Sequence, residues 1–164
     1  MSPTRPDLVE CWVFRVLPDA GPQLLLLRRA PGRIFPGLWQ CVTGGVEAGE
    51  RVPLAALREV REELGFARPE VEAFYDLDTV THFYDDGPDA IVAGAVFAVR
   101  VRPDAEPTLS HEHDEARWVD RDEALRLVVW PSYEATIDRL LACLLDPGRE
   151  PWFRLGTDGR RLAR

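Results

Sequence analysis

The sequence contains no lysine, so all 20 of its basic residues are arginine. A guanidinium is a planar fork that matches phosphate oxygens, which makes phosphate recognition one interpretation of this bias. A genome that favours arginine codons accounts for most of it. Acidic residues number 28, so the net charge is −8. This balance excludes general binding to nucleic-acid polymers, which requires a basic face. It permits a small anionic substrate if a bound cation inverts the local field.

Long apolar runs are also missing. No run approaches the roughly 18 residues that a membrane-spanning helix needs, and the N-terminus does not have the pattern of a secretion signal. Cysteine is scarce, because Cys11, Cys41 and Cys143 are the only three and lie far apart. That spacing is typical of buried thiols in a reducing compartment, rather than of a disulfide framework or a zinc site. We therefore expect a cytoplasmic protein with no membrane partner.

The composition that remains is globular, with 46% apolar residues and enough length for one core. We expect one domain over residues 1–146, followed by a polar tail over residues 147–164. The sequence leaves the role of this tail open between disorder, packing against the domain and a dimer contact, so a homodimer also stays open.

Apolar periodicity and turn residues predict the order of the elements. Strands are expected over residues 8–17, 23–28, 39–43, 71–83, 90–101 and 115–119, and helices over 52–64, 121–127 and 131–145. The first two strands form a hairpin, and glycine and proline mark residues 30–38 as a loop. Pro53 lies in the first turn of the first helix and Gly65 ends it, but no capping side chain precedes it.

Residues 44–66, GGVEAGERVPLAALREVREELGF, are the most informative stretch. Helical geometry puts Glu59, Glu62 and Glu63 on one face and an apolar stripe on another. Like charges at these spacings destabilise a bare helix by roughly a few tenths of a kcal/mol per pair. Clustered oxygen ligands suit Mg²⁺ or Mn²⁺ better than zinc. A solvated acidic stripe is the alternative, and the upstream Gly44 and Glu50 weigh against it.

The fixed residues follow the pattern G-x5-E-x7-R-E-U-x-E-E-x-G-U, where U is bulky and apolar. This pattern resembles the box of the Nudix hydrolases. The resemblance implies an α+β fold, an α/β/α sandwich with a mixed sheet in which the box forms loop–helix–loop. It implies that Arg58 pairs with Glu50 and that a carbonyl near Gly44 joins a metal shell. It also implies hydrolysis of a nucleoside diphosphate linked to another group, with water and a divalent metal.

A second stretch, residues 109–125, also resembles the family through its E-H-x3-R-W segment, which begins at Glu112. By resemblance, Glu112 is a further metal ligand or the general base, with Glu62 and Glu59 as alternative bases. A rival hypothesis comes from His111, His113 and Glu115, which alternate and could bind zinc from one face of a strand.

Residues 39–63 are similar to the dihydroneopterin triphosphate diphosphatases, a Nudix group also named dATP pyrophosphohydrolases. The resemblance implies pyrophosphate release from a pterin or nucleoside triphosphate. Alternatives are the removal of oxidised dNTPs, the cleavage of dinucleoside polyphosphates, and a catalytically silent nucleotide sensor. Aromatic residues such as Trp39 and Phe83 are candidates to stack on a base or pterin.

The candidate site thus has three overlapping sets of residues. The catalytic set is Glu62, Glu59, Glu112, Arg58 and Glu50; the metal set is Glu59, Glu62, Glu63, Glu112 and Gly44; the substrate set is Arg28, Arg29, Trp39, Gln40 and Phe83.

Overall fold

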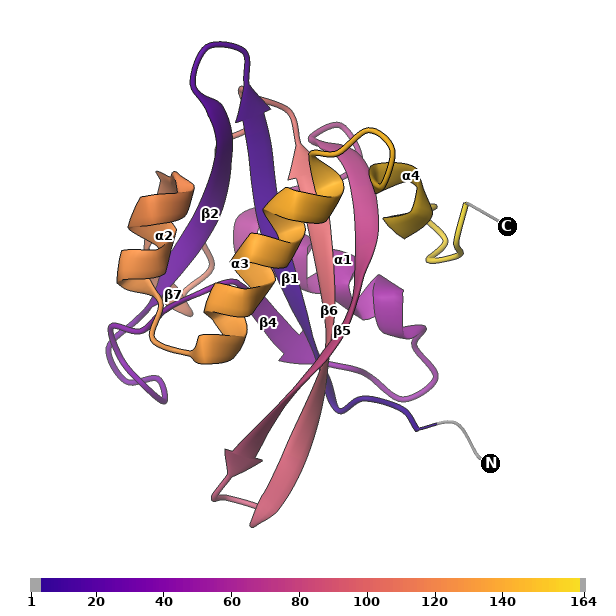
Figure 1. Ribbon diagram of the computed structural model, residues 1–164. Helices are drawn as coiled ribbons and strands as arrows, with labels where there is room; N and C mark the ends of the chain where they lie inside the picture. The colour runs from indigo at the N-terminus through magenta and orange to yellow at the C-terminus, as the bar shows by residue number, and fades with distance from the viewer. Residues whose placement is uncertain (1–3, 163–164) are drawn as a thin grey trace.

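The computed structural model describes residues 4–162 and joins eight strands into one mixed sheet (Figure 1). The strands are β1 (Leu8–Leu17), β2 (Gly21–Arg29), β3 (Trp39–Gln40), β4 (Val42–Gly45), β5 (Val71–Asp85), β6 (Ala90–Val101), β7 (His113–Val119) and β8 (Arg154–Leu155). The helices are α1 (Val52–Leu64), α2 (Arg121–Leu127), α3 (Pro131–Leu144) and the short α4 (Glu150–Phe153).

The strand order is β3-β2-β1-β6-β5-β8, with β4 paired to β1 and β7 paired to β2. The expected hairpin of β1 and β2 is confirmed, with Val13 opposite Leu25. β1 and β6 run parallel, and the other pairs are antiparallel. The sheet is therefore mixed, as expected.

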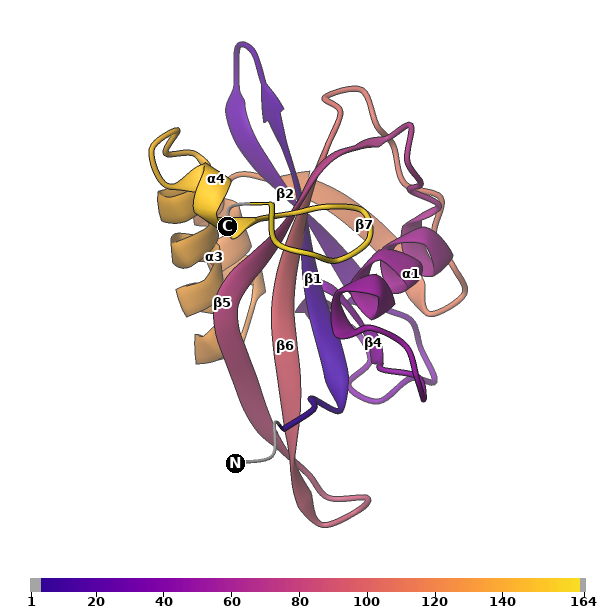
Figure 2. The same cartoon turned by 90° about the vertical axis from the view of Figure 1, so that its right-hand side faces the viewer.

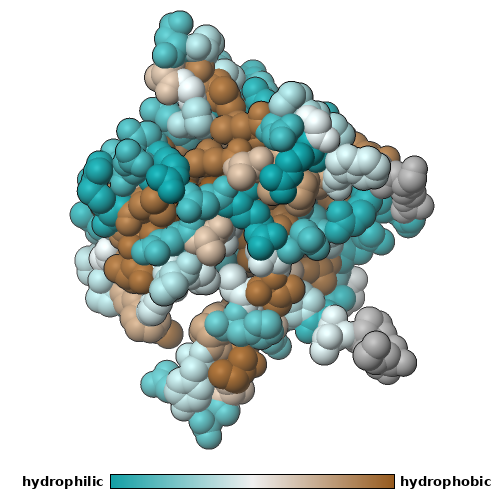
Figure 3. Space-filling model, in the orientation of Figure 1, coloured by the Kyte–Doolittle hydropathy of each residue, from teal (hydrophilic) through white to brown (hydrophobic). Residues whose placement is uncertain are grey.

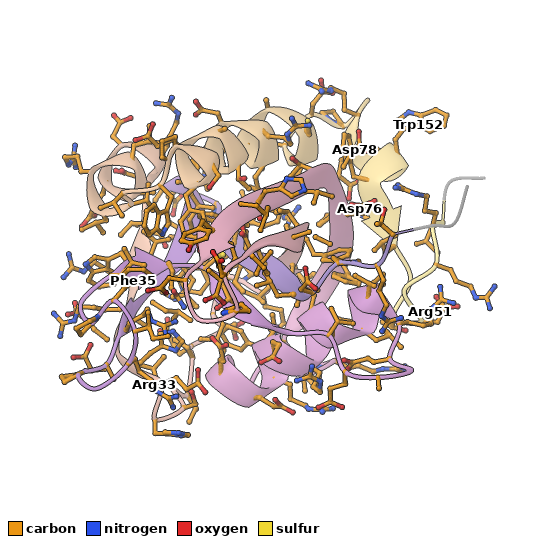
Figure 4. All side chains as sticks on the ribbon, turned by 90° about the horizontal axis from the view of Figure 1, so that it is seen from below. Arg33, Phe35, Arg51, Asp76, Asp78 and Trp152 are labelled. Carbon is orange, nitrogen blue, oxygen red and sulfur yellow. The ribbon has the colours of Figure 1, made fainter. Side chains whose placement is uncertain are left out.

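Each face of the sheet packs against a helix because side chains alternate along β1. Val9, Cys11 and Val13 belong to the core beneath α1, whereas Trp12 and Phe14 belong to the core beneath α3. Figure 2 shows α3 and α1 on opposite sides of the sheet, and Figure 4 shows the same three layers from below. The expected α/β/α sandwich is confirmed.

The segment expected as one strand over residues 39–43 forms two strands that pair with different neighbours. Gln40 lies opposite Leu27 of β2, whereas Val42 lies opposite Cys11 of β1. The chain therefore crosses from one strand to the next at Cys41. Periodicity does not reveal such a switch, because it carries no information about pairing partners.

The C-terminal segment packs back onto the sheet, which was one of the three alternatives that the sequence left open. β8 pairs with β5, Leu155 is buried in the core beneath α1, and the Tyr75 hydroxyl donates to Glu150 at 2.7 Å. This segment therefore completes the edge of the sheet beyond β5.

β5 and β6 extend past the rest of the sheet as a two-stranded hairpin, which projects downward in Figures 1 and 2. β5 continues two residues beyond the expected end at Phe83. Apolar side chains are exposed on this hairpin (Figure 3), among them Phe83, Tyr84 and Ile91. Within residues 4–162, no helix is long and apolar enough to cross a membrane.

Candidate active site on the helix α1

Helix α1 begins and ends where the sequence predicts. Arg51 at its N-cap makes no side-chain capping bond, Pro53 lies in the first turn, and Gly65 ends the helix with a left-handed φ of 73°. Ala56, Val60 and Leu64 are buried against the sheet. The helix therefore presents its glutamates along the edge of that buried face.

Arg58 joins the loop before α1 to the helix. Its guanidinium donates to both carboxylate oxygens of Glu50, at 2.9 and 3.1 Å, and to the Gly45 carbonyl at 2.8 Å. It also donates to Glu59 at 2.5 Å and to Glu62 at 3.2 Å. A bidentate charged pair is both strong and directional. The expected pairing of Arg58 with Glu50 is thus present, and it positions two further carboxylates.

Gly44 lies directly against Glu59. A Cβ built at Gly44 would stand 2.0 Å from the Glu59 Cδ atom and 2.1 Å from its Oε1 atom. No side chain fits in this space, so glycine at position 44 allows the carboxylate of α1 to touch the end of β4. The backbone of β4 and the Glu59 side chain of the helix are therefore in direct contact.

Glu63 is the most buried of the carboxylates on α1. Burial, followed by the charges of Glu59 and Glu112, raises the pKa of Glu63 to about 8. Its Oε2 atom lies 3.7 Å from Nδ1 of His113, and no hydrogen-bond partner reaches this oxygen within residues 4–162. Burial, followed by the charge of Arg29, lowers the pKa of His113 to about 4, so this imidazole is neutral near pH 7. The contact is therefore not an ion pair.

Glu112 brings a carboxylate from the distant second stretch to α1. Its side chain contacts Arg33 at 3.4 Å, and its carbonyl accepts from the Ala30 amide at 2.9 Å. Its charge contributes to the raised pKa values of Glu59 and Glu63, both of which burial raises first. The four carboxylates of the expected metal set thus lie within electrostatic reach of one another.

Comparison with known proteins assigns this arrangement to a family, because the family model described as NUDIX domain matches residues 9–140. The chain belongs to the Nudix family. The match includes α1 with its preceding loop, and it also includes Glu112.

Two curated relatives and one solved structure show what the chain is similar to. The chain is 39% identical over 132 residues to an octanoyltransferase of Myxococcus xanthus, covering 77% of this chain and 35% of that protein. It is 32% identical over 116 residues to the nucleoside triphosphatase NudI of Klebsiella pneumoniae, covering 68% and 81%. The E. coli dihydroneopterin triphosphate pyrophosphohydrolase matches with a TM-score of 0.67 and 26% identity, covering 82% and 94%. The chain thus spans about a third of the first relative and about four fifths of the second.

The Nudix box offers a divalent cation only oxygen atoms. Within residues 4–162, no three His, Cys, Asp or Glu side chains are grouped so that they could hold a metal ion, and Arg58 engages Glu59 and Glu62. The buried, unpartnered oxygen of Glu63 and the mutual repulsion of the carboxylates nevertheless fit a hard cation such as Mg²⁺.

The structure does not support the zinc hypothesis for His111, His113 and Glu115. Only His113 and Glu115 lie in β7, whereas His111 is exposed in the preceding turn. Glu115 is bound by Arg28 at 3.0 Å and by Arg117 at 2.7 Å, and His113 is buried beside Glu63. The three side chains therefore do not converge, because the strand begins only at His113.

The proposed substrate residues divide into two groups in this Nudix domain. Arg29 donates to Gln40 at 3.3 Å, and the Gln40 amide lies 3.2 Å from His113, so both adjoin the glutamates. Arg28 instead binds Asp114 at 2.8 Å, and its guanidinium lies 5.9 Å from the Trp39 ring centroid. Alternation along β2 explains the separation, because consecutive residues point to opposite faces.

Phe83 lies elsewhere, on the projecting hairpin of β5 and β6. His113 and Arg33 are site neighbours to which the sequence assigned no role of this kind. The E-H pair of the second stretch was a signal for His113. No sequence signal pointed to Arg33, because its contact with Glu112 depends on the path of the loop over residues 30–38.

Proposed function

We propose that this chain is a Mg²⁺-dependent (or Mn²⁺-dependent) Nudix hydrolase that cleaves a diphosphate linkage in a nucleoside or pterin triphosphate. The observation that supports it is that Gly44 leaves room for Glu59 at the end of β4, and that Glu62, Glu63 and Glu112 all lie within electrostatic reach of Glu59. Carboxylates within electrostatic reach of one another repel, and a hard cation offsets that repulsion.

Each residue has a part in the proposed chemistry. The oxygens of Glu59, Glu62, Glu63 and Glu112 would hold a divalent cation, which would supply positive charge to the diphosphate and acidify a nearby water for attack at phosphorus. Arg58 holds Glu50, Glu59 and Glu62 in register. The side chain of Glu112 is partly exposed and, within residues 4–162, its one ion-pair partner is Arg33, so we infer that it takes the proton of the attacking water.

Two relatives guide the proposed substrate class. NudI is a nucleoside triphosphatase at 32% identity, and the E. coli pyrophosphohydrolase at 26% identity acts on dihydroneopterin triphosphate. Both names describe triphosphates on a ring. The octanoyltransferase is covered over only 35% of its length, so its name gives no substrate for this chain.

The proposal is tested by replacing Glu63 with glutamine and measuring pyrophosphate release in Mg²⁺. We expect kcat to fall on the order of 100-fold or more, since a bound metal is worth several kcal/mol in the transition state. The fold should remain, because Glu63→Gln keeps the side chain's shape. Glu134→Gln, an exposed position on α3, is the matched control and should keep wild-type kcat. Full activity of Glu63→Gln, or of Glu62→Gln combined with it, contradicts the assignment.

A substrate panel separates the proposed substrates from the alternatives. Dihydroneopterin triphosphate, dATP, dGTP, 8-oxo-dGTP and diadenosine tetraphosphate are compared by kcat/KM at equal Mg²⁺ concentration. A preference for the first three supports the proposal. Selective cleavage of 8-oxo-dGTP or of the dinucleotide supports a house-cleaning role instead, and nucleotide binding without turnover supports a silent sensor.

A further inference from the structure

A second carboxylate site lies on the opposite face of the sheet from α1. Glu10 of β1 alternates with Trp12 and therefore points to the side of the sheet that α3 covers. It is only 5% exposed, and no residue of the Nudix box contacts it through a hydrogen bond within residues 4–162. A carboxylate this deeply buried requires a partner.

Half of this carboxylate is satisfied. The Thr81 hydroxyl donates to Oε1 of Glu10 at 2.6 Å. Gly94 packs against this hydrogen bond, since a Cβ at position 94 would stand 2.9 Å from the Thr81 hydroxyl and 3.5 Å from Oε1 of Glu10. Thus Oε1 is fixed on the side of β5 and β6. The other oxygen, Oε2, has no hydrogen-bond partner within residues 4–162.

Leaving such an atom unpaired has an energetic cost. A buried polar group without a partner destabilises a fold by roughly 1–3 kcal/mol, and by more if it is charged. Burial raises the pKa of Glu10, against the opposing effect of the Thr81 hydrogen bond. A leucine or glutamine would avoid the charge at this position. A buried carboxylate with one unpaired oxygen therefore points to a ligand that donates to it.

The position of Glu10 connects it to the proposed reaction centre. Glu10 lies opposite Thr43 of β4, and the next residue is Gly44, which touches Glu59. Opposed residues in an antiparallel pair have Cα atoms about 5 Å apart. The side chain of Gln40, next to His113, also reaches the Thr43 hydroxyl at 3.4 Å. A substrate with its phosphates at the glutamates can thus extend its ring across β4 toward Glu10.

The N-terminal end of α3 covers this region of the sheet (Figure 1). Tyr133 in the first turn of α3 and Cys41 both lie near Glu10. Burial raises the pKa values of the Cys41 thiol and the Tyr133 hydroxyl first, and the Glu10 charge adds to both shifts.

Aromatic surfaces lie on both sides of the region. Phe83 shares a face of β5 with Thr81 and is 44% exposed. On the other side, Trp130 precedes α3 and packs edge-on against Phe35, with ring centroids 5.8 Å apart. Figure 4 shows Phe35 on the loop before β3, and Figure 3 shows the surface indented between the hairpin and the lobe that carries α2. Flat rings stack on such side chains.

We propose that Glu10 is a specificity-determining residue that binds the ring of the substrate through two adjacent N–H donors. The edge formed by a ring N–H and a neighbouring 2-amino group, which guanine and pterins share, matches a carboxylate. Oε2 accepts one donor, and the remaining lone pair of Oε1 accepts the other. Adenine presents one donor beside one acceptor and does not match. This inference rests on the proposed triphosphate hydrolysis.

The first test uses the wild-type chain and compares dGTP with dITP, which lacks only the 2-amino group. A hydrogen bond to a charged group is worth about 1.5–3 kcal/mol, so kcat/KM should be about 10–100 times higher for dGTP. Dihydroneopterin triphosphate belongs in the same comparison, because it shows whether the shared edge is taken from a purine or a pterin. Equal rates with dGTP and dITP overturn the inference and leave the proposed function intact. Absence of hydrolysis for every triphosphate overturns both.

The second test replaces Glu10 with glutamine. The amide keeps an acceptor for Thr81 but presents an acceptor and a donor to the ring, a pattern that matches adenine. We expect kcat/KM to fall about 10-fold or more for dGTP and to hold or rise for dATP. An equal fall for both nucleotides indicates a purely structural Glu10 and overturns the inference. Glu72→Gln, on the surface of β5, is the control. If Glu10→Gln does not fold, Thr81→Val should lower the dGTP-to-dITP ratio, and an unchanged ratio overturns the inference.

Discussion

Gly44 shows how much can depend on one residue. The Glu59 carboxylate occupies the space that a Cβ at position 44 would need, with carbon atoms 2.0 Å apart. Neither group can retreat freely, because Gly44 is paired with Val9 in the sheet and Glu59 is held by Arg58. The sequence alone is compatible with Gly44 in an ordinary turn, whereas the structure shows that packing against Glu59 requires glycine at this position.

We expect Gly44→Ala to displace Glu59 and lower kcat by about 100-fold, since a misplacement of about 1 Å has effects of that size. Gly45→Ala is the matched control. A Cβ at Gly45 meets no atom within 4 Å, and Gly45 is not among the glycines with a left-handed backbone. Steady-state kinetics and a Mg²⁺ titration measure both variants. Similar activity of the two variants would show that the Gly44 contact with Glu59 has no part in turnover.

At the scale of elements, one arginine joins the loop before α1 to the helix. Arg58 and Glu50 are both mostly buried, so their bidentate pair is shielded from water. The Gly45 carbonyl accepts from the same guanidinium, which ties the end of β4 into the same unit. The guanidinium of Arg58 therefore ties the loop, the strand end and the helix together.

Arg58→Ala should lower both activity and the free energy of unfolding, the latter by about 2 kcal/mol, because several charged hydrogen bonds are lost. Arg58→Lys keeps the charge without the fork and should recover only part of either property. Arg61→Ala, exposed on the same helix, should change stability by less than about 0.5 kcal/mol. Urea denaturation and kinetics provide the measurements. A fully active and equally stable Arg58→Ala variant would contradict the role of Arg58 in joining the loop to the helix.

The short strand β8 is a second element whose contribution can be measured. Leu155→Ala removes a buried side chain from the core beneath α1, and we expect a loss of about 2–4 kcal/mol in stability. Trp152→Ala, at a position that is 70% exposed on α4, should cost less than about 0.5 kcal/mol. Thermal unfolding distinguishes the two. If Leu155→Ala unfolds at the wild-type temperature, the C-terminal segment does not contribute to the fold.

At the scale of the whole molecule, charge is the dominant feature. The net charge is −8, and four carboxylates of the proposed site lie close together at one end of β4. Self-repulsion of this kind destabilises the folded state relative to the unfolded one. A cation that binds only the folded chain should therefore stabilise the whole protein.

Mg²⁺ is expected to raise the free energy of unfolding by about 2.7 kcal/mol at a concentration 100 times its Kd. Denaturant titrations with Mg²⁺ and with EDTA measure this difference. Sodium chloride at matched ionic strength controls for general screening, which acts on all exposed charges. The effect should disappear in Glu63→Gln. Equal midpoints in Mg²⁺ and in matched sodium chloride would show that the cluster does not bind the cation.

The sequence by itself determined the local parts of this protein. Helix α1, its stop at Gly65 and its row of glutamates follow from periodicity and from one glycine, which act within a few residues. The spacing of the Nudix box identified the family, and the family resemblance predicted the mixed sheet and the pairing of Arg58 with Glu50.

Only the tertiary structure decided which distant segments meet. It split residues 39–43 between β2 and β1, paired β8 with β5, and separated Arg28 from Arg29. It also buried His113 beside Glu63 and left Glu10 half satisfied beneath α3. These outcomes depend on strand pairing between residues far apart in the chain. The energy of such pairing comes from contacts with distant residues, which a local sequence pattern does not identify.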